Sequence, residues 1–132
     1  MEIRLIEKGG VPASEIDAQQ KIQKTFDAAA FTKGWRGYAS FKLHRGGPGA
    51  GDDDFDLVLV THTHIIVIEL KNWRGGKLES RGGNWYVDGQ PRGRSPVPLV
   101  NLKAKRLGTT LNTRVGPAKT PLVLSFVVLS GS

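Results

Sequence analysis

The sequence predicts an α/β domain in which a mixed central sheet is flanked by two helices. Two apolar runs rich in β-branched residues, 55–60 and 65–70, have the length and composition of strands. Two longer segments, 15–30 and 96–111, repeat apolar residues at helical spacing. Together with weaker strand signals elsewhere in the chain, these segments predict the element order helix, three strands, a small extra hairpin, helix and strand.

Composition limits the class of protein. The 132 residues suit one domain with a proper core, and the formal charge of +7 favours a polyanionic partner such as nucleic acid. The absence of cysteine excludes a disulfide framework and a thiolate zinc site. The N-terminus carries charges where a signal peptide needs an apolar run, and no run approaches the ~20 residues of a membrane span. We therefore expect a soluble cytoplasmic protein.

The first helix is predicted from about Glu15 to Ala30, after residues 3–6, which form either a short strand or a lead-in. Ser14 is the expected N-cap, and Asp17 three residues later gives a capping-box-like pattern.

One stripe of this helix mixes apolar and polar side chains. Glu15 and Gln19 fall on the same stripe as Ile22, Phe26 and Ala29. Polar groups on a buried stripe need partners. On its position alone, Glu15 can equally complement the helix dipole in the first turn.

Residues 35–43 read as the first core strand, followed by a glycine-rich loop at 46–51. The acidic run 52–54 comes next. Asp54 has the strand parity of Asp56 and is a possible metal ligand, but the favoured interpretation is a solvated loop end.

The strands 55–60 and 65–70 should form an antiparallel hairpin. A turn centred on His62 and Thr63 pairs residues whose numbers sum to 125, which sets Asp56 opposite Glu69 on one face of the sheet. Lys71, two residues beyond Glu69, joins that face. His62 and His64 are more simply solvated turn residues than a metal site.

Two opposed carboxylates on an apolar hairpin repel each other and are costly to bury. Lys71 compensates in part, and a divalent cation bound by both carboxylates compensates better. The alternative is that the strands fray, leaving Asp56 and Glu69 in water.

After the hairpin, a turn at 72–76 leads into a small second hairpin, 77–80 with 85–87, with a turn signal at Asp88-Gly89. Ser95 and Pro96 then begin a helix that runs to about Leu111.

The core stripe of this second helix consists of Val100, Ala104, Leu107 and Leu111, with Lys103 and Arg106 to one side. Residues 120–129 are predicted to form a buried strand that closes the sheet. The chain stops soon afterwards, which suggests a piece of a longer protein.

The residues between Asp56 and Gly75 carry a family resemblance. Asp56 followed after twelve residues by Glu69-x-Lys71 resembles the PD-(D/E)xK nuclease superfamily. The longer string through Asn72, Trp73 and Gly75 resembles the NERD, or nuclease-related, domain. The resemblance covers about residues 14–129 after a lead-in at 1–13. It implies one domain across 1–132 with a restriction-endonuclease-like αβββαβ core.

The resemblance implies a metal-dependent nuclease. Asp56, Glu69 and the backbone carbonyl of Leu70 would hold Mg²⁺ or Mn²⁺, with Glu15 as a possible further ligand and catalytic residue. Lys71 would orient or help to deprotonate the attacking water, or stabilise the transition state.

Contacts with nucleic acid, DNA in preference, are expected from a second set of side chains. Trp73 can stack on a base, although packing within the protein is the favoured interpretation. The candidates for phosphate contacts are Arg74, Lys77, Lys103 and Arg106.

Two departures from the resembled pattern leave other functions open. Phe55 stands where the superfamily has proline, and Pro98-Leu99-Val100 replaces a glutamine usual early in the second helix of NERD-like sequences. Asn101 or Lys103 is a possible substitute. The rival hypotheses are a catalytically silent nucleic-acid-binding module and a protein-interaction module, in a larger repair or defence protein. A homo-oligomer is also possible.

Overall fold

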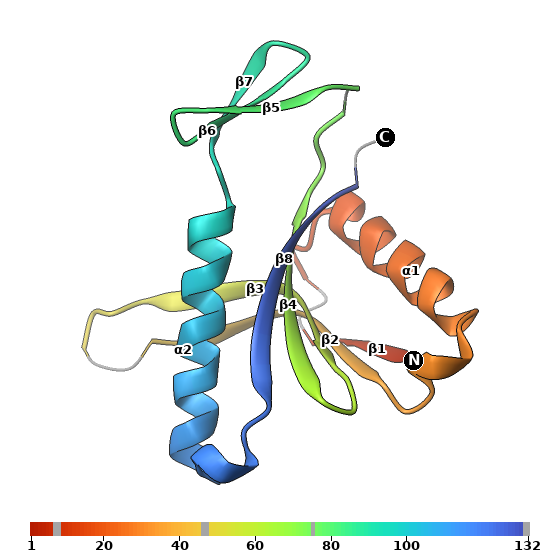
Figure 1. Cartoon of the computed structure of the whole chain (residues 1–132), viewed down its shortest axis with the longest axis vertical. Coiled ribbons are helices and arrows are strands. Elements are labelled where there is room, and N and C mark those ends of the chain that lie inside the picture. Colours follow the sequence, from red (N-terminus) through yellow and green to blue (C-terminus); the bar gives the residue numbers. More distant parts are fainter. Residues whose placement is uncertain (7–8, 46–47, 75, 131–132) are drawn as a thin grey trace.

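A mixed five-stranded sheet forms the centre of the computed structural model, which describes residues 1–6, 9–45, 48–74 and 76–130 (Figure 1). The outer strand on each side runs parallel to its neighbour, and the three central strands are antiparallel. The predicted fold class is confirmed. In spatial order the strands are β1 (Glu2–Leu5), β2 (Arg36–His44), β3 (Asp52–Val60), β4 (His64–Lys71) and β8 (Leu122–Leu129).

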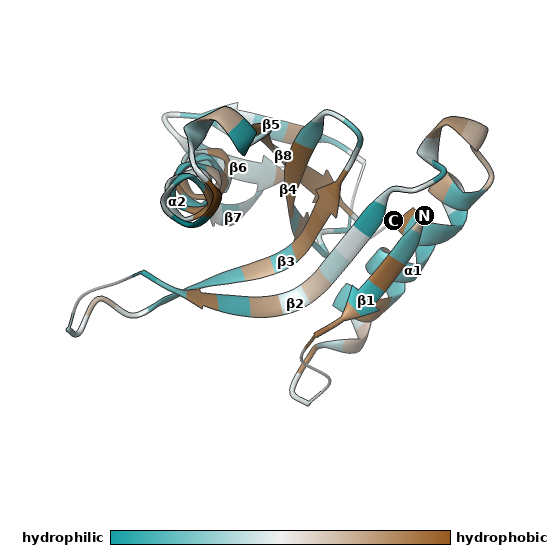
Figure 2. Cartoon of the chain, turned by 90° about the horizontal axis from the view of Figure 1, so that it is seen from below, coloured by the Kyte–Doolittle hydropathy of each residue, from teal (hydrophilic) through white to brown (hydrophobic). Residues whose placement is uncertain are grey.

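The helices α1 (Ala13–Asp27) and α2 (Val97–Val115) lie on opposite sides of this sheet (Figure 2). Two short 3-10 helices, η1 (Ala30–Thr32) and η2 (Pro117–Lys119), follow them. No helix in the described part of the chain combines the length and apolarity needed to span a membrane. On the α2 side the core contains Val67, Val100, Ala104 and Leu107, and on the α1 side it contains Ile22, Phe26, Leu57 and Leu59.

A second, three-stranded antiparallel sheet stands off the end of β4 (Figure 1). Its strands are β5 (Leu78–Arg81), β6 (Asn84–Val87) and β7 (Gln90–Arg94). The predicted hairpin is present, and β7 extends it. The sequence did not predict strand β7, because all of its residues are exposed and it contains proline and glycine, which are unusual inside strands.

The predicted helix ends needed correction. Helix α1 begins at Ala13, with Pro12 as the N-cap residue and no side-chain cap, so Ser14 lies inside the first turn. It ends at Asp27 rather than Ala30, because Thr32 donates its hydroxyl to the carbonyls of Phe26 and Ala29 and closes a separate turn.

Helix α2 also differs from its predicted bounds. It begins at Val97, and Ser95 still accepts the N–H of Val97 at 3.3 Å. It continues past Leu111 to Val115 and stops where Gly116 takes a φ of 87°, a conformation that favours glycine.

Two predictions about the edges of the sheet are resolved. Residues 2–5 form a strand, β1, so residues 36–44 make the second strand and not the first. The last strand, β8, is not fully buried, because it is the outermost strand of the sheet. The exposed fractions of Leu122, Phe126 and Leu129 are 64%, 52% and 41%.

The predicted register between β3 and β4 is confirmed over four pairs, from Val60–Ile65 to Leu57–Ile68. The ladder ends there, so the expected direct pair of Asp56 with Glu69 does not form.

An irregularity in the backbone explains why the ladder ends. Phe55 packs on the α2 side of the sheet and Leu57 on the α1 side, although residues two apart in a strand normally share a face. β3 therefore changes faces at Asp56. The β2–β3 ladder skips the pair of Ser40 with Asp56, and Ser40 has a φ of 56°.

A test of the packing concerns Gly37, which lies in β2 between β1 and β3. A Cβ atom there would sit 2.7 Å from Ile3 Cγ1 and 3.2 Å from Leu59 Cδ2. Gly37→Ala should lower the free energy of unfolding by about 1–3 kcal/mol through overpacking. Urea unfolding measures this. Gly9→Ala, where a Cβ meets nothing within 4 Å, is the control. Equal losses in both variants would contradict the close packing at Gly37.

Candidate active site

Charged side chains from four elements converge near the C-terminal half of β4. Helix α1 contributes Glu15, β3 contributes Asp56, and α2 contributes Lys103. Strand β4 contributes Glu69 and Lys71. The structure therefore brings together the four residues predicted to be catalytic and adds a lysine from the second helix.

Asp56 reaches β4 through its side chain. Its Oδ2 accepts a hydrogen bond of 2.9 Å from the backbone N–H of Leu70. Burial raises the pKa of Asp56 to about 6, above its ordinary 3.8, and the neighbouring Glu15 carboxyl raises it too, whereas the Leu70 N–H lowers it. The Asp56 carboxylate is thus short of compensating positive charge.

A hydrogen-bond network on the α1 side fixes this part of the site. The Gln19 side chain donates to Ser40 Oγ at 3.0 Å and to the Asp56 carbonyl at 2.9 Å. Ser40 Oγ in turn donates to Glu15 Oε2 at 2.7 Å. The polar stripe predicted on the first helix therefore has partners, and Glu15 lies in the site beside Asp56.

Sequence reasoning missed Ser40. A non-glycine residue at positive φ costs about 1–3 kcal/mol and persists only where its surroundings enforce it. Here the enforcement comes from Gln19 and Glu15, both more than 20 residues away in sequence. The sequence signal was only a small polar residue inside a predicted strand.

Glu69 lies between two lysines. Its Oε2 is 3.2 Å from Lys103 Nζ, and its Oε1 is 3.9 Å from Lys71 Nζ. Burial and the Asp56 carboxylate raise the pKa of Glu69, whereas both lysines lower it. Lys103, expected beside the core stripe, points inward and is only 7% exposed.

The donor set fits a hard divalent cation. The Lys71 carbonyl accepts the N–H of Ser130 on the β8 side. Alternate residues of a strand direct their backbone groups to opposite edges, so the Leu70 carbonyl faces β3, where Asp56 lies. The described residues contain no group of three His, Cys, Asp or Glu side chains arranged to hold a metal. Mg²⁺ is nevertheless commonly held by one or two carboxylates and water, and two crowded carboxylates with raised pKa values suit it.

A cavity of about 400 Å³ opens onto the α1 side of the site. Its lining includes Glu15, Asp56 and Asp54. Asp54 is exposed and lies 3.9 Å from Lys42, so its side chain projects from the strand into the solvent-facing part of this hollow. The run 52–54 is part of β3 and not a loop end.

The match to a family model completes this description. The model of the nuclease-related domain, NERD, matches residues 14–130. The chain belongs to the nuclease-related domain family. No curated protein and no solved structure matches it.

In this NERD domain, aromatic packing connects Lys71 to the small sheet. Lys71 Nζ lies 5.9 Å from the centre of the Trp73 ring, and Trp73 packs edge-on against Trp85 with ring centres 5.8 Å apart. Trp73 therefore packs within the protein. Arg74 is exposed, Lys77 pairs with Glu79 at 3.3 Å, and Gly75 lies outside the described residues.

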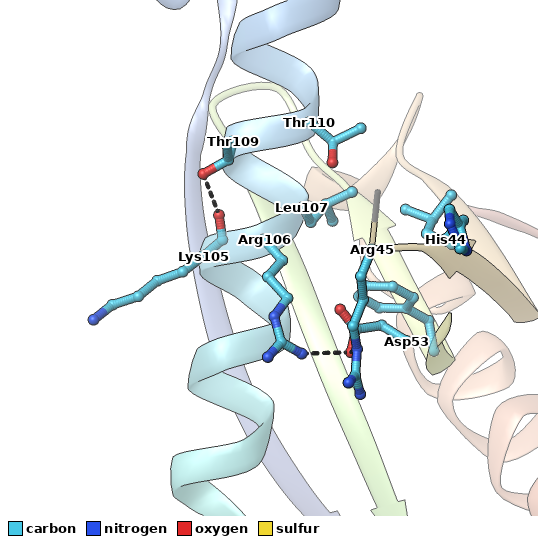
Figure 3. A pocket seen from close by; sticks show the side chains of 10 residues that line it. His44, Arg45, Asp53, Lys105, Arg106, Leu107, Thr109 and Thr110 are labelled. Carbon is cyan, nitrogen blue, oxygen red and sulfur yellow. Dashed lines mark hydrogen bonds and ion pairs between the residues drawn. The ribbon is translucent and has the colours of Figure 1, made fainter. Parts of the chain in front are cut away.

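The acidic run also holds a second ionic cluster (Figure 3). Asp53 is 3% exposed, and its Oδ1 lies 3.0 Å from Arg45 and 2.7 Å from Arg106. The expected solvated loop end is wrong for this residue, because two guanidinium groups compensate the buried carboxylate. Arg106, predicted to contact phosphate, thus joins α2 to β3 beside a cavity of about 200 Å³.

The raised pKa of Asp56 predicts how stability depends on pH in the presence of a chelator. Because the folded-state pKa of about 6 exceeds the ordinary 3.8, the folded state binds more protons between these values. The raised pKa of Asp56 therefore adds to the free energy of unfolding below about pH 4, and this contribution is lost as the pH rises through about 6. Relative to Asp56→Asn, the wild type should lose roughly 1–2 kcal/mol of unfolding free energy between about pH 4.5 and 7.5.

Urea unfolding in EDTA across this pH range, for the wild type and Asp56→Asn, makes the measurement. The difference between the two proteins cancels the titrating groups that do not interact with Asp56, and it retains Asp56 together with Glu69, whose pKa Asp56 raises. A difference that stays constant, or that grows in favour of the wild type with rising pH, would contradict the assigned environment of Asp56.

Proposed function

We propose that this NERD domain is a metal-dependent nuclease that hydrolyses phosphodiester bonds, with DNA as the favoured substrate. One observation carries the proposal: Asp56 and Glu69 come from different strands to share a partly buried site beside Lys71. Their carboxyl pKa values are raised by burial and by nearby carboxylates, which is the environment that a divalent cation relieves.

Asp56, Glu69 and the Leu70 carbonyl would hold Mg²⁺ or Mn²⁺, with Glu15 next to Asp56. When bound, such an ion lowers the pKa of a water ligand and neutralises charge on the scissile phosphate. Gln19 and Ser40 keep Asp56 and Glu15 in place through their hydrogen bonds.

Lys71 is the lysine placed to meet the substrate. Its side chain is 34% exposed, and its ammonium group lies 3.9 Å from Glu69 Oε1. From this position it can hold an attacking water beside the carboxylates, or offer positive charge to the phosphate in the transition state. Trp73, two residues after Lys71, packs edge-on against Trp85 of β6.

The small sheet supplies a basic surface next to the site. Residues 76–94 contain four basic side chains, Lys77, Arg81, Arg92 and Arg94, and only two acidic ones. Both carboxylates are engaged: Asp88 accepts the N–H groups of Gly76 and Lys77, and Glu79 pairs with Lys77 and Arg81.

Three arginines remain for a partner. Within the described residues the structure shows no carboxylate partner for Arg74, Arg92 or Arg94, and all three are exposed. Exposed arginines bind phosphate groups in two-pronged fashion, without reading sequence. We therefore propose that the arm formed by 74 and 76–94 holds the nucleic-acid backbone beside the cut.

A second candidate is a silent nucleic-acid-binding module. The observation that favours it is the pair of Lys103 with Glu69, because it neutralises one carboxylate without a metal ion. Cleavage separates the two functions.

The proposed nuclease should cut labelled DNA with Mg²⁺ or Mn²⁺ and not with EDTA. Glu69→Gln and Lys71→Met should each lower the rate at least about a hundredfold, because each removes a group acting at the reacting atoms. Gel assays with single- and double-stranded substrates measure this. Glu2→Gln, which removes an exposed carboxylate from the outer strand β1, is the matched control. Folded wild-type protein that cuts neither substrate with either metal would contradict the nuclease proposal.

The proposed arm is tested by binding without cleavage, in the Glu69→Gln background. Adding Arg92→Gln with Arg94→Gln should weaken DNA binding several-fold and reduce the slope of log affinity against log salt by about 2. Fluorescence anisotropy across a salt series measures both. Lys24→Gln with Lys33→Gln removes the same charge from exposed positions around α1. An equal change in the two pairs would show that only net charge matters.

A further inference from the structure

Lys103 is a lysine inside the core. It is 7% exposed, and its neighbours on the helix face, Val100, Ala104 and Leu107, are buried apolar residues. Lysine is almost never fully buried unless it is paired. Its partner is Glu69, whose Oε2 lies 3.2 Å from the ammonium nitrogen.

The two lysines at Glu69 hold different oxygens in different environments. The Lys71 side chain is 34% exposed and lies 3.9 Å from Oε1, whereas the Lys103 side chain is 9% exposed and lies 3.2 Å from Oε2. Lys103 is enclosed on α2 beneath the carboxylate, so a substrate phosphate does not reach it. Its role is exerted through Glu69, which makes it a positioning residue.

The charges around Lys103 determine what the site can accept. Asp56 and Glu69 act on it from β3 and β4, Glu15 on α1 adjoins Asp56, and Lys71 is the other cation at Glu69. Three carboxylates and two ammonium groups carry a formal charge of −1 when all are ionised. One divalent ion makes the cluster +1, and a second would make it +3 in a partly buried site. Without Lys103, the same cluster would start at −2.

We propose that Lys103 is a resident counter-cation, which holds Oε2 of Glu69, leaves Oε1 for the metal, and restricts the site to one weakly bound divalent ion. This inference rests on the proposed metal-dependent function and names a property of the same site. It makes the helix lysine a determinant of metal affinity and stoichiometry, and it leaves the chemistry at the phosphate to Lys71.

The test is Mn²⁺ binding without nucleic acid, measured by calorimetry and by the loss of the free Mn²⁺ signal in electron paramagnetic resonance. Lys103→Gln should bind Mn²⁺ at least about tenfold more tightly than the wild type, the effect of one unit charge within about 4–6 Å. Lys103→Arg keeps the charge and should stay close to the wild-type affinity. Lys105→Gln removes an exposed charge two residues away on the same helix and should change the affinity less than about twofold.

Thermal unfolding gives an independent readout and covers a poorly folded variant. In EDTA, Lys103→Gln should melt below the wild type, because Glu69 has lost its buried partner. Mn²⁺ should then raise its midpoint more than that of the wild type, in proportion to the tighter binding. Lys103→Met, which fills the apolar part of the space, should show the same larger shift.

The outcomes separate this inference from the proposed function. Wild-type protein that binds one Mn²⁺ ion, with Lys103→Gln and Lys103→Met binding equally or more weakly, overturns the counter-cation role alone. Binding of two ions by the wild type also overturns it. Wild-type protein that binds no Mn²⁺ overturns the metal-dependent function, and the inference falls with it.

Discussion

The approach of three carboxyl groups within a partly buried site is the constraint on which the rest of this structure depends. Glu15, Asp56 and Glu69 come from three elements. Neighbouring carboxylates repel each other and oppose folding unless their charge is compensated. Each carboxylate has its own partner. Asp56 accepts a backbone N–H of β4, Glu15 accepts the Ser40 hydroxyl of β2, and Glu69 lies near a lysine of β4 and a lysine of α2. The raised pKa values show that this compensation is incomplete, and a divalent cation is the group that would complete it.

The irregular backbone of β2 and β3 follows from the same constraint. If the ladder had continued, Asp56 would face Glu69 directly, with two carboxylates in contact. Instead the strands change faces at Ser40 and Asp56, and the Asp56 carboxylate turns to the Leu70 N–H. Gln19 stabilises this break by donating to Ser40 and to the Asp56 carbonyl. Backbone strain is thus located at the site, where the surrounding contacts maintain it.

Local pattern was enough to predict the fold class and the hairpin that carries Asp56 and Glu69. The register of β3 with β4 is confirmed because the hairpin is local and two-residue periodicity fixes its faces. The stripe Val100, Ala104 and Leu107 is buried as helical periodicity required. What could not be predicted depends on residues far apart in sequence: the end of the ladder at Leu57, and the pairing of Asp53 with Arg106. Periodicity gives the face on which a residue lies, but not the partner that it meets there.

Lys103 shows how much that difference matters. In sequence it is a basic residue next to a core stripe, which is typical of a lysine whose stem lies on the protein and whose charge reaches solvent. The sheet places Glu69 under that stripe, so the same side chain turns inward and becomes an internal ion pair. One carboxylate then has a solvent-side cation on one oxygen and a core-side cation on the other. In the proposed nuclease, the solvent-side Lys71 would meet the substrate and the core-side Lys103 would position Glu69, so two residues of the same type would have different roles.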